Sequence, residues 1–257
     1  KHRLQLNAEI VFLFIEAKHD RCVYLNNLLK SIDMPENMRY EVIKAKFDEE
    51  LSSLLDYLNE QKSKLAPSFV FIDPFGYSDT PFSLVKRIME NKKCEVLITF
   101  MYSFIKRALP KHNQEEHLDK LFGTKKWTKA RNVSIASERK EFILRLYMKQ
   151  LEEVAKIKHV RFFEMINKFN QTEYFLFFGT NNLEGLRQIN ASMWKADPSG
   201  GFQFSDRTNP KQIVLFTPKP NYDLLKKGKG MLQRSYLLLI EEVDEFILVS
   251  GFTNFKN

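Results

Sequence analysis

Apolar runs of strand length alternate with segments of helical periodicity along the first hundred residues, and this alternation constrains the fold most strongly. The strand-like runs cover residues 9–17, 40–47, 68–73 and 94–101. The segments between them place apolar residues at helical spacing, over residues 20–32, 48–65 and 80–91. Strands that alternate with helices are typical of a parallel sheet with helices on both faces. The sequence therefore predicts an α/β fold.

The second half of the chain departs from this alternation. Residues 103–158 are mostly helical in pattern and rich in Lys and Glu, so we expect a helical insertion over the sheet. Two strands follow over residues 159–166 and 173–180, and the turn-like segment between them predicts an antiparallel hairpin closing one edge of the sheet. We expect this α/β domain to span residues 1–205. A helix that runs into a strand predicts a small winged-helix module over residues 206–257.

Composition narrows the class of protein. Apolar residues make up 44% of the 257 residues and charged residues 28%, which is typical of a folded soluble domain. No apolar run approaches the roughly 18–20 residues of a membrane span, and the N-terminal segment fits a strand better than a signal peptide. Cys22 and Cys94 form no disulfide or zinc pattern, so we expect a protein of the reducing cytoplasm.

The chain carries a net charge of +8, which is compatible with an anionic partner such as nucleic acid. Two basic segments, residues 123–131 and 219–230, each contain an aromatic residue, Trp127 and Tyr222. Lysines with an aromatic between them suit phosphate contact combined with base stacking. The alternative for each segment is a solvated lysine-rich loop.

Acids follow three of the predicted strands. In an open parallel sheet, ligands bind outside the carboxyl ends of the strands, which is where Glu16, Asp48 and Asp73 fall. Glu16 suits a ribose diol, because a carboxylate accepts two hydrogen bonds; the alternative is a solvated strand-end acid. For Asp48 the alternative is a helix N-cap, because helical spacing begins there.

Asp73 is followed by Pro74, Phe75 and Gly76. Pro74 favours an extended backbone at Asp73 and so holds the carboxylate forward at the strand tip. Phe75 offers a flat face to a planar ring, and Gly76 lets the backbone turn or approach a ligand. These residues are the predicted catalytic corner, and a purely structural corner is the alternative.

Other residue types give weaker indications. His112 and His117 do not have the spacing of a zinc-binding HExxH helix, so we expect no metal site. Arg107 follows the strand over residues 94–101 and suits either an anionic substrate or an ordinary surface position. No glycine-rich nucleotide-binding motif occurs in the sequence.

Two stretches, FVFIDPFGYSDTPFSLV (residues 69–85) and FFGTNNLEGLRQINASMWKADPSGGFQFSD (residues 177–206), resemble the three-Cys-motif partner protein family. These bacterial proteins are similar to class I S-adenosylmethionine-dependent methyltransferases. The resemblance implies a Rossmann-like sheet, S-adenosylmethionine as cofactor and a three-Cys-motif, radical-SAM-like protein as partner. It also implies a cofactor-binding glycine loop upstream of Lys1.

Carried over by position, the resemblance implies that Glu16 holds the cofactor ribose and that Asp48 lies near the adenine amino group. Asp73 to Gly76 then correspond to the motif that orients the methyl acceptor. Enzymes that methylate base amino groups have a second proline and an aromatic where this chain has Phe75 and Gly76, with Tyr77 one step later. The acceptor therefore stays open.

Two functions follow as hypotheses. The first is a methyltransferase that uses S-adenosylmethionine and acts on or with nucleic acid, together with the three-Cys-motif partner. The second is a non-catalytic, nucleic-acid-binding partner subunit with a methyltransferase-like fold.

Overall fold

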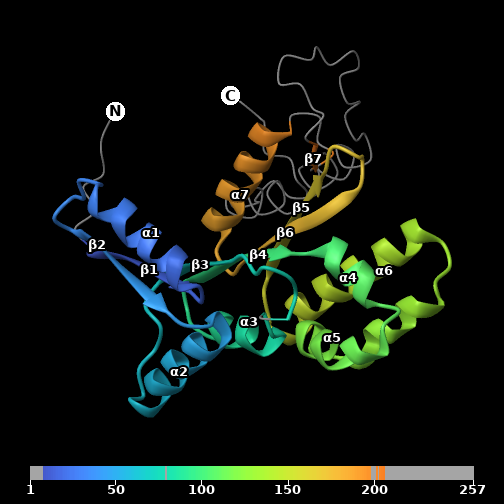
Figure 1. Ribbon diagram of the computed structural model, residues 1–257, viewed down its shortest axis with the longest axis horizontal. Coiled ribbons are helices and arrows are strands. Elements are labelled where there is room, and N and C mark those ends of the chain that lie inside the picture. Colours follow the sequence, from blue (N-terminus) through green and yellow to red (C-terminus); the bar gives the residue numbers. More distant parts are fainter. Residues whose placement is uncertain (1–7, 79, 198–200, 202, 206–257) are drawn as a thin grey trace, which may run out of the picture. The chain divides into compact units, whose positions relative to one another are not determined.

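The computed structural model describes residues 8–78, 80–197, 201 and 203–205 (Figure 1). Backbone contacts divide the chain into two compact units, Lys1–Lys64 and Leu65–Asn257, and each is described by itself. Both units combine helices with strands, so the α/β prediction is confirmed. The winged-helix module predicted for residues 206–257 lies outside the described residues.

The first unit is a strand–helix–strand–helix arrangement. Its elements are β1 (Ile10–Glu16), α1 (His19–Lys30), β2 (Met38–Lys44) and α2 (Phe47–Glu60). The two strands are parallel and in register, from Ile10 opposite Met38 to Glu16 opposite Lys44. Because the two strands are parallel, the carboxyl ends of β1 and β2 lie side by side at one end of the pair. Acids fill the first turn of α2, which follows β2, and interact favourably with the helix dipole there.

The second unit is built on a five-stranded sheet. Its strands are β3 (Ser68–Ile72), β4 (Cys94–Phe100), β5 (His159–Ile166), β6 (Thr172–Thr180) and β7 (Gln203–Ser205), and their spatial order is β3-β4-β6-β5-β7. β3 and β4 are parallel, as predicted. β5 and β6 form the predicted antiparallel hairpin, but β6 also pairs antiparallel with β4. The sheet is therefore mixed, and the prediction of a parallel sheet is wrong for this half.

The composition of β6 explains its central position. Phe175 and Phe177 on one face are fully buried, and Phe178 on the other is 5% exposed. A strand that is apolar on both faces is stabilised by neighbours on both sides and by cover above and below. The hairpin therefore inserts β6 into the sheet instead of closing its edge, and β7 pairs with the far side of β5.

Helices cover both faces of this sheet. Figure 1 shows α3 (Phe82–Met89) and α5 (Glu115–Phe122) on one side of it and α7 (Leu183–Ala196) on the other. Aromatic rings fill the core between the sheet and the first group of helices. Tyr147 lies at the centre of these rings, 4.5 Å from Phe100 and 5.1 Å from Phe177 between centroids.

The predicted helical insertion is confirmed between β4 and β5. It comprises α4 (Tyr102–Ala108), η1 (His112–Gln114), α5, η2 (Lys125–Asn132), α6 (Ala136–Lys149) and η3 (Gln150–Val154). Helix α5 ends at Gly123, which has a φ of +62°. A Cβ at Gly123 would lie 2.6 Å from the Phe82 ring, so both the backbone conformation and the packing favour glycine there.

Candidate functional site

Glu16 and Asp48 lie at the same edge of the first unit. Glu16 is the last residue of β1, opposite Lys44 at the end of the parallel strand β2. Helix α2 begins three residues after Lys44, and Asp48 is in its first turn. The structure therefore brings these two predicted cofactor residues to the carboxyl edge of a parallel strand pair, which is where such folds bind ligands.

The Glu16 carboxylate is only partly engaged by its own loop. It accepts a hydrogen bond from the Lys18 backbone N–H at 2.8 Å, and the Arg21 guanidinium lies 3.7 Å away. The Glu16 side chain is 29% exposed. Because a carboxylate has about four acceptor positions, Glu16 retains capacity for hydroxyl donors of a ligand.

Asp48 has a buried oxygen that no protein group satisfies. The N-cap residue of α2 is Lys46, so the alternative of Asp48 as a helix cap is wrong. Within the described residues, the Oδ1 atom of Asp48 is buried and has no hydrogen-bond partner. A buried acceptor left without a donor costs about 1–3 kcal/mol. A ligand that brings an N–H group to Oδ1 would recover that free energy.

The predicted catalytic corner lies at the end of β3 in the second unit. Ile72, the last residue of the strand, is 2% exposed, whereas Asp73 directly after it is exposed. The Phe75 side chain is 83% exposed, and Gly76 has a φ of +130°. The buried strand thus delivers an acid and an aromatic ring to the surface, as the sequence predicts.

Tyr77 anchors this corner to the helical insertion. Its hydroxyl donates to Oε1 of Gln114 at 2.5 Å, and its ring meets the His117 ring edge-on with centroids 6.5 Å apart. Burial raises the pKa of the Tyr77 phenol. Sequence reasoning treated Tyr77 only as a displaced aromatic, because nothing local links it to a glutamine 37 residues away.

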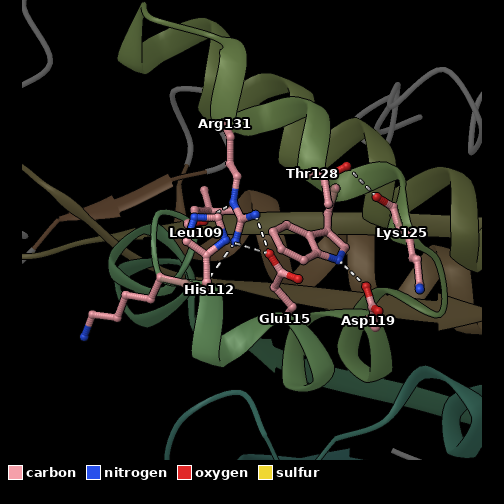
Figure 2. Close-up of polar contacts among 9 residues, drawn as sticks. Leu109, His112, Glu115, Asp119, Lys125, Thr128 and Arg131 are labelled. Carbon is pink, nitrogen blue, oxygen red and sulfur yellow. Dashed lines mark hydrogen bonds and ion pairs between the residues drawn. The ribbon is translucent and has the colours of Figure 1, made fainter.

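The prediction that the basic segment over residues 123–131 stacks on a base through Trp127 is wrong. Trp127 is fully buried and donates its indole N–H to Oδ1 of Asp119 at 2.7 Å. The Cζ atom of Arg131 lies 4.9 Å from the centroid of the Trp127 ring. Figure 2 shows the Arg131 guanidinium donating hydrogen bonds to the Glu115 carboxylate and the Leu109 carbonyl. Trp127 is therefore unavailable to a base.

The physical reason is the helix type. With three residues per turn, η2 places Trp127 and Ala130 in one row, and both are fully buried. Lys125, Lys126 and Lys129 lie in the other rows and are exposed. The second basic segment, residues 219–230, lies outside the described residues.

Arg107 and His112 occupy ordinary surface positions. The Arg107 guanidinium stacks 4.5 Å from the centroid of the neighbouring Phe104 ring. The exposed His112 ring contacts Oε1 of Glu115 at 3.1 Å. These contacts support the surface alternative for Arg107.

A cavity of about 980 Å³ lies at the amino ends of β3 and β4, whereas Asp73 follows the carboxyl end of β3. It opens where β3 and β4 begin and where β6 ends, beside α7. Phe69 and Phe178 contribute apolar surface, and the Glu95 carboxylate accepts a hydrogen bond from Thr180 Oγ1 at 2.6 Å. Sequence reasoning missed this cavity because it considered only the carboxyl ends of the strands.

Comparison of the chain with known protein families, with curated proteins and with solved structures found no match. The resemblance to three-Cys-motif partner proteins therefore stays a prediction. Among the described residues, no helix is long and apolar enough to span a bilayer.

Proposed function

We propose that this chain is a methyltransferase of the class I type, which binds S-adenosylmethionine through Glu16 and Asp48 and orients a methyl acceptor with Asp73. The observation that carries the proposal is the unsatisfied Oδ1 of Asp48, at the same strand edge as Glu16. An adenosine needs acceptors for a ribose diol and for the adenine amino group. Glu16 and Asp48 are acceptors of the required kind.

Sheet topology supports the fold in this proposal. In class I methyltransferases, the last strand lies antiparallel between the two strands that precede it in sequence. Here β6 follows β4 and β5 in sequence and pairs antiparallel with both. A sheet topology supports a fold but not an activity. The proposed activity therefore rests mainly on the two carboxylates, Glu16 and Asp48.

The proposed role of Asp73 and Phe75 is to position the methyl acceptor. When bound, S-adenosylmethionine supplies an electrophilic methyl group, and transfer requires chiefly that the acceptor is held in line. Asp73 would accept a hydrogen bond from the N–H or O–H group that is methylated, and the proton that this group loses would pass to the Asp73 carboxylate or to water. Phe75, which is largely exposed, would pack against a planar acceptor.

Isothermal titration calorimetry on the full-length protein tests the cofactor site. We expect Asp48→Asn and Glu16→Gln each to weaken S-adenosylmethionine binding by about tenfold or more, because a hydrogen bond to a charged group contributes about 1.5–3 kcal/mol. Glu49→Gln is the matched control, because Glu49 lies next to Asp48 in α2 but pairs with Lys46 at the surface. Glu49→Gln should bind like the wild type.

The absence of any binding heat at millimolar cofactor would overturn the proposal. Equal weakening by Glu49→Gln would show that the effect is not specific to the acceptor pair. Thermal unfolding of each variant separates loss of binding from loss of folding.

The second hypothesis, a non-catalytic subunit that binds nucleic acid, is favoured by the three exposed lysines of η2, Lys125, Lys126 and Lys129. Cofactor binding separates the two functions, because only the first requires it. The three-Cys-motif protein stays the predicted partner for either function.

A further inference from the structure

Positive charge is concentrated in one part of the helical insertion. Residues 106–131 contain eight lysines and arginines but only three acids, an excess of five positive charges in a chain whose net charge is +8. We call this segment the basic insertion. Clustering of this kind, more than net charge itself, is what indicates a polyanionic partner.

The acids within the basic insertion are already engaged. Glu115 binds Arg131 at 2.6 Å, and Glu116 binds Lys120 at 2.7 Å. Asp119 accepts the hydrogen bond from the buried Trp127 indole. Figure 2 shows Glu115 and Asp119 on α5 turned toward η2. Glu115 and Asp119 thus join α5 to η2, whereas Glu116 pairs with Lys120 on the exposed surface of α5.

The lysines of η2 are accessible to a ligand. Within the described part of the chain, no ion pair involves Lys125, Lys126 or Lys129, and all three side chains are exposed. Lys126 and Lys129 are one turn apart in a helix with three residues per turn, so they leave the same side of it. Trp127 and Ala130 hold the opposite row in the core, which fixes the lysine-bearing backbone before any ligand binds.

The basic insertion is physically joined to the Asp73 corner. Tyr77, four residues after Asp73, bonds to Gln114 and contacts His117, and both residues belong to the basic insertion. Phe75 lies between Asp73 and Tyr77 and is 83% exposed. An exposed aromatic ring and a row of lysines are therefore presented by segments that are tied together.

We propose that the basic insertion binds the phosphate backbone of single-stranded nucleic acid, with Phe75 stacking on a base beside Asp73. Lysine binds phosphate as a point charge, and a basic surface with an exposed aromatic is the combination that proteins use for single strands. An acidic peptide would match the charge but would offer no planar base to Phe75. This inference names the acceptor class of the proposed function and rests on it for the role of Asp73.

Fluorescence anisotropy tests the inference with the full-length protein and a labelled single-stranded oligonucleotide of about 15 nucleotides, without cofactor. The variant replaces Lys125, Lys126 and Lys129 with Gln. The control replaces Lys92, Lys156 and Lys158, three exposed lysines of the same unit outside the basic insertion, with Gln. Both variants lose the same charge.

We expect the η2 variant to bind at least tenfold more weakly and the control to lose less than about threefold. Between about 50 and 200 mM salt, the log–log salt slope should fall by about 2 in the η2 variant, since each phosphate contact on a single strand contributes about 0.7. Phe75→Ala should weaken binding about fivefold or more without changing the salt slope, because stacking releases no counterions.

Equal losses in the two lysine variants, or wild-type binding by the η2 variant, would overturn the inference. Displacement of the oligonucleotide by polyglutamate at equal charge concentration would also overturn it, in favour of an acidic protein partner. Calorimetry with S-adenosylmethionine on the η2 variant keeps the two proposals distinct. Intact cofactor binding with lost η2-dependent nucleic-acid binding supports both, whereas nucleic-acid binding without cofactor binding overturns only the proposed function.

Discussion

Tyr147→Phe should stabilise the protein. Tyr147 is fully buried at the centre of the aromatic core, and its hydroxyl has no hydrogen-bond partner among the described residues. Its ring lies 4.5 Å from Phe100 and 5.1 Å from Phe177, and phenylalanine keeps both contacts. A buried hydroxyl without a partner costs about 1–3 kcal/mol. Removing only the oxygen should therefore raise the free energy of unfolding by about 1–2 kcal/mol.

Urea denaturation followed by circular dichroism measures this change. The midpoint should rise with an unchanged m-value, and each kcal/mol should raise Tm by about 2–4 °C for a chain of this size. Tyr147→Ala is the control, because it removes the ring as well and should destabilise by about 3–5 kcal/mol. Destabilisation by Tyr147→Phe of 1 kcal/mol or more would refute the reasoning, since it would mean that the hydroxyl has a partner in solution.

The pH dependence gives a second test of the same residue. Burial raises the pKa of Tyr147 above its ordinary value near 10. The unfolded chain therefore loses the phenolic proton first, so the folding stability is fully present below pH 10 and falls as the pH rises further. Tyr147→Phe lacks this proton, so its stability advantage over the wild type should widen above pH 10.

Three further substitutions test the packing and the surface contacts. Glu115→Gln should destabilise the protein at pH 7, because hydrogen bonds from the neighbouring arginine and histidine lower the pKa of Glu115; the difference should shrink as the pH falls below the ordinary glutamate pKa of about 4.3 and vanish only below the lowered pKa of the folded state, and thermal melts at falling pH measure it. Gly123→Ala should cost about 2 kcal/mol or more in urea denaturation, from its positive φ and the contact with Phe82, and Phe82→Leu should relieve part of that cost. Thr180→Val should cost about 1–3 kcal/mol in the same assay, because the Glu95 carboxylate loses its hydroxyl donor.

Periodicity predicted the elements well because local patterns determine them. The run at residues 159–166 became β5 with the same bounds, and the helix predicted over residues 80–91 became α3, Phe82–Met89. Pairing depends on partners far apart in sequence. The apolar faces of residues 173–180 suit a central strand, but they do not identify β4 as the second neighbour or make that pairing antiparallel, so the mixed sheet could not be predicted from the hairpin alone.

The candidate site shows the same division. The positions of Glu16 and Asp73 at strand ends follow from local pattern, and the structure has both there. The burial of Trp127 could not be predicted from the local pattern, because a helix with three residues per turn buries a different side chain than an α-helix would. The orphan oxygen of Asp48 and the bond from Tyr77 to the insertion depend on tertiary packing.

The most direct test of the proposed function is a crystal structure of the full-length protein with S-adenosylhomocysteine. We expect the adenine amino nitrogen at about 2.7–3.2 Å from Oδ1 of Asp48, with the ribose hydroxyls on the Glu16 carboxylate. A ligand bound elsewhere, with Oδ1 of Asp48 facing only protein or water, would contradict the proposed function.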